Sequence, residues 1–202
     1  MITREDLAGK AQKEIEALLD TDMQAYVVEV SEMTDLDTLG EKEKDLMLLM
    51  DENDARLKTV EYDVADSCTF DNQAFNRKTV TDYIADFIGT MEVEWSYALG
   101  LYELVKLWKN KDLEKIQYHA YDSTLRILGQ CKFKGFENWK KIMVVNAFLS
   151  TCHDEYVRDT SYMIYLNSLH NALLDAMDKI KKASEEPEQV ESDAEQVESD
   201  AE

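Results

Sequence analysis

The sequence predicts an all-α protein, an irregular bundle of about six or seven helices around a long central helix, followed by a disordered acidic tail. Apolar residues recur at the three- and four-residue spacing of amphipathic helices along most of the chain. The only proline is Pro187, so this helix breaker is missing from everything before the tail. The 202 residues suit one domain, expected over residues 1–182, with the tail at residues 183–202.

The N-terminal part predicts two helices. Thr3 and Asp6 form a Thr-x-x-Asp pattern typical of a helix start, and helical spacing continues to about residue 33. Residues 26–30 are rich in β-branched side chains and also fit a short strand, although helix is the preferred interpretation. Thr38 and Glu41 form a capping box that opens the second helix.

A connector without helical spacing follows the second helix. Residues 63–78 are rich in Asp, Asn, Gln and Ser, which indicates a loop or an ordered connector. At its start Val60, Tyr62 and Val64 alternate with polar residues, so the sequence leaves open a minor β element there.

Residues 79–110 are predicted to form the central helix. Thr79 and Asp82 give another capping pattern at its start. Apolar side chains cover about half of the helix circumference, which is wider than one neighbouring helix requires. A second row, suited to the close approach of another helix, consists of small residues: Gly89, Val93, Ser96 and Gly100. We therefore expect a rod roughly 48 Å long, packed on both flanks.

Glu94 interrupts the apolar arc of this predicted rod. A carboxylate at that position would be costly to bury without a partner, so it is expected to be paired or protonated. A structural ion pair is the preferred interpretation, and a metal ligand or proton carrier is the alternative.

The rest of the chain predicts three further helices. The first covers about residues 113–129, and a second, apolar on nearly all sides, begins at Phe136. A break is expected near residues 150–155, before a last amphipathic helix that reaches about Ile180. The tail repeats Glu-Gln-Val-Glu-Ser-Asp-Ala at residues 188–194 and 195–201, and its composition favours a solvated segment over a coiled coil.

The net charge of −21 is unevenly distributed along the sequence. Residues 1–105 contain 9 basic and 25 acidic side chains, whereas residues 106–141 contain 9 basic and 4 acidic ones. Phosphates would be repelled outside this basic island, so nucleic acid is not expected as the main ligand. The island is instead a candidate interface: Lys106, Lys109, Lys111, Lys115, Arg126, Lys132, Lys134, Lys140 and Lys141.

Cysteine usage and the N-terminal residues bear on location. Cys68, Cys131 and Cys152 are odd in number and widely spaced, which favours a reducing compartment over a disulfide framework or a zinc site. The N-terminus lacks a signal sequence, and no run is apolar for about 18 residues, so no membrane partner is expected. We expect a cytoplasmic protein, or one within a virus particle if the source is viral.

The sequence contains no recognisable catalytic, phosphate-binding or metal-binding motif. In particular, the Glu-x-x-His pairs of di-iron helical proteins are missing, and we predict no cofactor and no metal. The remaining candidates form a predicted buried polar set, interpreted as a hydrogen-bond network: Glu94, Asn146, Ser150, His153, Asn167 and His170.

These observations favour a non-catalytic structural or assembly protein, a subunit of a homo- or hetero-oligomeric complex such as a ring or a virus particle. One alternative is an adaptor or regulator whose acidic tail binds a basic partner. A second is a helical-bundle enzyme that uses Glu94 and the histidines.

Overall fold

The computed structural model describes residues 1–185, so the predicted acidic tail, apart from its first three residues, lies outside the described residues. Within residues 1–185 there are seven α-helices and two small two-stranded sheets, which confirms the all-α class and a minor β element. No helix in this part of the chain is long and apolar enough to cross a membrane.

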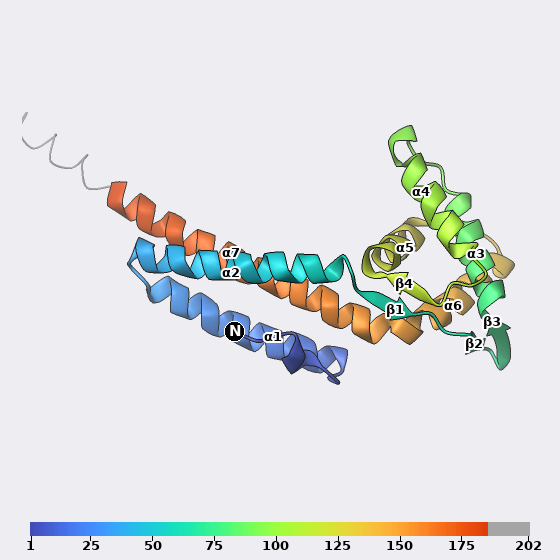
Figure 1. Ribbon diagram of the computed structural model, residues 1–202, viewed down its shortest axis with the longest axis horizontal. Coiled ribbons are helices and arrows are strands. Elements are labelled where there is room, and N and C mark those ends of the chain that lie inside the picture. Colours follow the sequence, from blue (N-terminus) through green and yellow to red (C-terminus); the bar gives the residue numbers. More distant parts are fainter. Residues whose placement is uncertain (186–202) are drawn as a thin grey trace, which may run out of the picture. The chain divides into compact units, whose positions relative to one another are not determined.

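Two compact units make up the described chain (Figure 1), whereas the sequence predicts one domain. Within the described residues, unit 1 comprises Met1–Asn53 and the chain from Thr160 to Glu185, and unit 2 comprises Asp54–Asp159. The boundaries between the units fall inside two continuous helices, α2 (Leu36–Leu57) and α7 (His153–Glu185).

Unit 1 is built from three helices around one apolar core. α1 (Gln12–Glu32) and α2 form a hairpin, and the C-terminal part of α7 lies alongside them (Figure 1). The buried core includes residues of all three helices: Ile15, Leu19, Val30, Leu39, Leu46, Leu166, Leu169 and Leu173. α1 continues through residues 26–30, so the preferred helical interpretation of that segment is confirmed.

The start of the chain is fastened to this core. Thr3 and Asp6 were predicted to start the first long helix; Thr3 does donate to Asp6, but the contact opens only a short 3-10 helix, η1 (Glu5–Leu7), and α1 begins at Gln12. The Tyr165 hydroxyl accepts a bond from the Ile2 amide at 3.2 Å and donates to Asp22. Burial, assisted by Asp22, raises the pKa of Tyr165.

Unit 2 contains both sheets. β1 (Glu61–Asp63) pairs antiparallel with β4 (Lys115–Gln117), and Tyr62 lies opposite Ile116. β2 (Ser67–Phe70) and β3 (Gln73–Asn76) form a hairpin in the segment expected to be a connector. Its two-residue turn, Asp71-Asn72, has positive φ at both positions, a conformation that Asp and Asn tolerate and that suits tight hairpins.

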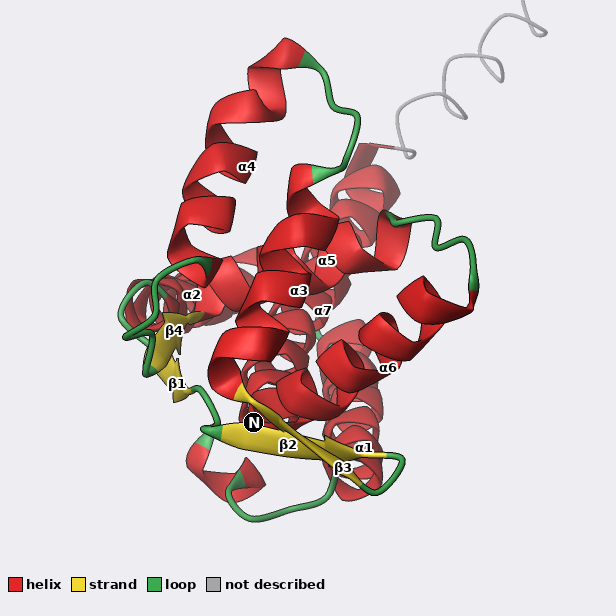
Figure 2. Cartoon of the chain, turned by 90° about the vertical axis from the view of Figure 1, so that its right-hand side faces the viewer, coloured by secondary structure: helices red, strands yellow, loops and turns green. Residues whose placement is uncertain are grey.

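The helices of unit 2 pack around α3 (Arg77–Gly89), as Figure 2 shows. Three helices contact it: α4 (Trp95–Trp108), α5 (Tyr118–Gln130) and α6 (Phe136–Leu149). α3 begins after Asn76, whose side chain accepts from the Thr79 amide at 2.9 Å. The predicted start of a helix at Phe136 is confirmed, and so is the break near 150–155, where the 3-10 helix η2 (Ser150–Cys152) precedes α7.

The predicted central rod over residues 79–110 is wrong. α3 ends at Gly89, α4 starts at Trp95, and the two helices fold back against each other. The apolar spacing continues in phase across the break, so periodicity alone did not reveal it. Gly89 and the β-branched Thr90 are poor helix formers and stand where the helix ends. A Cβ at Gly89 would lie 3.9 Å from Val105, which places α4 close to α3 at that point.

The three thiols are expected to differ in reactivity. Cys68 and Cys152 are buried and Cys131 is half-buried, and burial raises the pKa of all three thiols. Because the thiolate is the reactive form, a disulfide reagent near neutral pH should modify Cys131 first and the other two only on unfolding. Mass spectrometry measures the modification rate of each thiol in the native protein. Equal rates for all three cysteines would contradict the difference in burial.

Candidate functional site

α4 exposes an apolar stripe that an isolated helical domain would be expected to cover. Of its 14 residues, only Leu104 and Trp108 are buried. Trp95, Leu99 and Tyr102, spaced as neighbours along one side of the helix, are 92%, 73% and 62% exposed. We call these three residues the α4 ridge. Contiguous exposed apolar residues of this size are typical of protein interaction sites.

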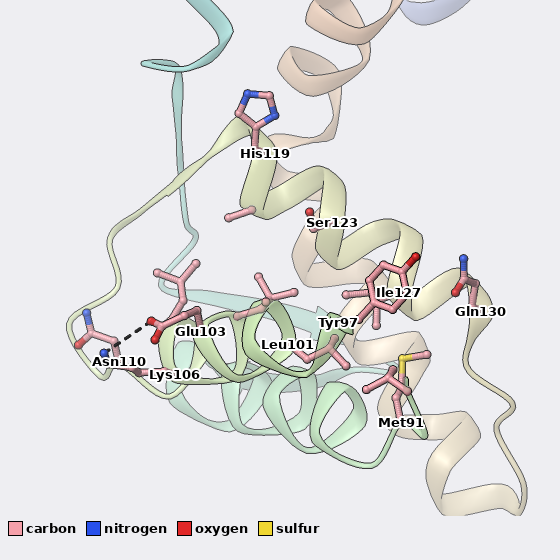
Figure 3. Close-up of a pocket in the computed structure, with 15 residues that line it drawn as sticks. Met91, Tyr97, Leu101, Glu103, Lys106, Asn110, His119, Ser123, Ile127 and Gln130 are labelled. Atoms are coloured by element: carbon pink, nitrogen blue, oxygen red, sulfur yellow. Dashed lines mark ion pairs between the residues drawn. The ribbon is translucent and has the colours of Figure 1, made fainter. Parts of the chain in front are cut away.

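Next to the ridge, a groove lies between α4 and α5 (Figure 3). It has a volume of about 1140 Å³, and its walls are mostly apolar. The apolar lining comes from the connection between α3 and α4, from α4 and from α5: Met91, Val93, Tyr97, Gly100, Leu101, Leu104, Leu107, Ala120 and Ile127. Polar side chains complete the lining: Glu103, Lys106, Asn110, His119, Ser123 and Gln130. We call this the α4–α5 groove.

The C-terminal end of α4 is anchored to α5 by a buried hydrogen bond. The Trp108 indole Nε1 donates to the Thr124 hydroxyl of α5 at 2.9 Å, and both side chains are buried. The Thr124 hydroxyl in turn donates to the Ala120 carbonyl at 2.7 Å. This anchor fixes one end of α4, while most of the side chains in its first two turns remain exposed.

Thr124→Val should lower the free energy of unfolding by roughly 1–3 kcal/mol, because a buried indole N–H loses its acceptor. Chemical denaturation measures the loss. Thr124→Ser, which keeps the hydroxyl, is the matched control and should retain most of the stability. Equal losses in both variants would show that the hydroxyl contributes little.

Charges are segregated along α4. Glu92 and Glu94 precede its first turn, whereas Lys106 and Lys109 stand at its last turn. The acidic side chains lie at the positive N-terminal end of the helix dipole and the basic side chains at its negative C-terminal end, so both interactions are favourable. Lys106 also lies 3.6 Å from Glu103 on the same helix (Figure 3), a contact of two exposed side chains that contributes little to stability.

A second apolar stripe is exposed on α6. Phe136, Trp139 and Met143 are spaced as neighbours on one face and are 81%, 62% and 45% exposed. In unit 1, the adjacent residues Met47 and Leu48 of α2 are also exposed. None of these residues lines the α4–α5 groove.

The buried polar centre of unit 2 is one that the sequence interpretation missed. Asp159 is fully buried, lies 3.0 Å from Arg56 Nη1 and accepts from the Tyr62 hydroxyl at 2.9 Å. Tyr118, Tyr121 and Tyr156 contact the Tyr62 ring at 5.7–6.5 Å between centroids. Burial, with the nearby Asp159, raises the pKa of Tyr62. The arrangement is a structural ion pair enclosed by aromatic rings.

The predicted buried polar set is mostly at the surface. Glu94, Asn146, Ser150 and Asn167 are exposed, so the prediction that they are buried is wrong. Glu94 escapes burial because the chain breaks before it, making it the residue that precedes α4 rather than a mid-helix position.

The two histidines of this set are half-buried. His153 lies near the Tyr156 ring, with 6.2 Å between ring centroids, and His170 lies 3.7 Å from Glu43 in unit 1. His119, outside the predicted set, lines the α4–α5 groove. Within residues 1–185, no three His, Cys, Asp or Glu side chains cluster closely enough to hold a metal ion.

The basic island lies wholly in unit 2, and part of it is occupied within the fold. Arg126 pairs with Asp122 at 2.8 Å, and Lys115 lies 4.0 Å from Asp63. Lys140 donates to Gln73, and Lys141 lies over the Tyr83 ring at 5.2 Å. Internal contacts therefore account for these members, while Lys106 and Lys109 belong to the charged end of α4.

Comparison of the chain with protein-family models, curated proteins and solved structures finds no match.

Proposed function

We propose that this chain is a non-catalytic assembly protein that binds protein through the α4 ridge and the α4–α5 groove. The observation that carries the proposal is the exposure of Trp95, Leu99 and Tyr102 beside a groove with largely apolar walls. A ridge of large apolar side chains next to such a groove offers the well-packed, desolvated centre that protein interfaces require.

The polar groups around the groove support binding rather than chemistry. Glu103 and Lys106 lie 3.6 Å apart at the rim, both exposed and only weakly paired, and the His119 side chain is exposed on α5. Glu94, the residue on which the enzyme alternative depends, stands in solvent at the start of α4. The groove thus offers a partner a recessed, largely apolar surface to bind.

Sedimentation velocity on the full chain tests the proposal. The expected result is a particle heavier than the 23.4 kDa chain, forming as the protein concentration rises. A chain ended at Glu185 should assemble equally well, because the α4 ridge and groove lie in residues 91–130. A 23.4 kDa species at every concentration would contradict the proposal, and assembly that depends on residues 186–202 would favour the adaptor alternative.

A further inference from the structure

We propose that the partner bound at α4 is the α4 helix of a second copy of this chain, running antiparallel to the first across a two-fold axis near Leu99 and Gly100. This inference rests on the proposed function and specifies its partner.

A two-fold interface requires that one surface complement itself. α4 meets this requirement because it presents a projecting part and a recessed part side by side. On an ideal helix Leu99 and Gly100 are separated by about 100°, so the ridge adjoins the flank of α4 that faces the groove. In an antiparallel pair, the ridge of each copy can therefore enter the groove of the other.

Gly100 makes close approach of the two helices feasible. It is exposed, and a Cβ built at this position would meet no atom within 4 Å. The backbone of α4 is thus uncovered at the middle of the apolar surface, where a neighbouring helix can pack with few steric obstacles. Ser96, one turn earlier on the same side, is also exposed and small.

The charges at the two ends of α4 select both the partner and its direction. Glu94 and Lys106 lie six residues on either side of Gly100, with Glu92 and Lys109 slightly further out. Antiparallel pairing places the acidic end of each helix beside the basic end of the other, whereas parallel pairing would place like charges together. Because the chain carries a net charge of −21, this local complementarity offsets the overall repulsion between copies.

The available area is consistent with a pair of copies. Large aromatic side chains bury about 150–250 Å² each, so Trp95, Tyr102 and Leu99 together offer on the order of 500 Å² per copy. The exposed groove residues Val93 and Tyr97 add to this. The total approaches the roughly 800 Å² per partner of a standard interface.

Charge reversal tests the direction of pairing. One variant combines Glu92→Lys with Glu94→Lys, and a second combines Lys106→Glu with Lys109→Glu. Each places like charges together in an antiparallel pair, so sedimentation equilibrium should show dimers dissociating at about tenfold higher concentration or more. The chain with all four substitutions restores opposite charges and should regain near wild-type dimerisation.

Matched controls carry the same change in net charge elsewhere. Lys132→Glu with Lys134→Glu serves for the basic end, and Asp51→Lys with Glu52→Lys serves for the acidic end; all four control residues are exposed. Both controls should dimerise like the wild type. Rescue by the fourfold variant together with unaffected controls supports the antiparallel pair.

The outcomes separate this inference from the proposed function. An assembly that persists unchanged through every charge reversal, or one that contains more than two copies, overturns the antiparallel pair and leaves the assembly function standing. A wild-type chain that stays at 23.4 kDa overturns both.

Discussion

Asp159→Ala is expected to lower the free energy of unfolding by about 3 kcal/mol, the largest stability loss we expect from any single substitution considered. The variant leaves the Arg56 guanidinium and the buried Tyr62 hydroxyl without the carboxylate that contacts both at 2.9–3.0 Å. Removing one partner of a buried pair costs about 3–5 kcal/mol. The lower end applies here because the Arg56 side chain is 29% exposed and can turn toward water.

A second aspartate of unit 2 provides the matched control. Asp122 also accepts from a tyrosine hydroxyl, that of Tyr156 at 2.7 Å, and pairs with an arginine, Arg126 at 2.8 Å. The Arg126 side chain is 72% exposed, so this pair is screened by solvent. Asp122→Ala should therefore cost about 1 kcal/mol in urea denaturation. Similar losses for the two variants would show that Asp159 is not an unusually important buried charge.

Leu99→Glu is expected to weaken self-association at least 100-fold without unfolding the chain. Leu99 is 73% exposed in the single chain, so a glutamate remains in water there and the fold is retained. In the antiparallel pair the same position lies near the two-fold axis, where two carboxylates would be desolvated close together. Central interface residues contribute about 2 kcal/mol or more each to the free energy of binding. In a two-fold pair the substitution is present in both copies, so its effect on that free energy is doubled.

Met143→Glu on α6 is the control for Leu99→Glu. It introduces the same charge at an exposed apolar residue of unit 2 that lies outside the α4 ridge and the α4–α5 groove. Circular dichroism should show both variants folded, and sedimentation equilibrium should show a lost dimer only for Leu99→Glu. If Met143→Glu alone dissociates the assembly, the α6 stripe is the interface and the assignment to α4 is wrong.

Helix starts and breaks with strong local signals could be predicted from the sequence. Gly135, with a φ of +84°, immediately precedes the predicted start of α6 at Phe136. The turn at Asp71-Asn72 was recognised only as a connector, because short strands carry little periodic signal. The break after Gly89 was missed, since the apolar residues of α3 and α4 keep one continuous helical phase.

The buried ion pair could be predicted only in part. Asp159 lies three residues before Tyr162 and seven before Leu166, on the apolar side of the last helix, so a buried carboxylate could have been suspected. Its partner Arg56 is about a hundred residues away in the chain, and no local pattern identifies it.

The apolar surface of α4 was visible in the sequence, but its role was not. The apolar arc of residues 79–110 is wider than one neighbouring helix requires, and the sequence interpretation assigned both flanks to packing within the chain. The structure packs α4 on α3 along one flank and leaves the ridge exposed. The apolar surface that the fold leaves exposed is the reason for proposing a partner.

The most direct measurement is oxidative cross-linking of Leu99→Cys in a chain that also carries Cys131→Ser, which removes the half-buried native thiol. Two copies of position 99 lie next to the proposed two-fold axis, so mild oxidation should convert the chain rapidly into a covalent dimer. Met143→Cys in the same background reports random collisions and should cross-link far more slowly. A Leu99→Cys chain that stays monomeric under oxidation, while its thiol reacts readily with a small maleimide, would contradict pairing through α4.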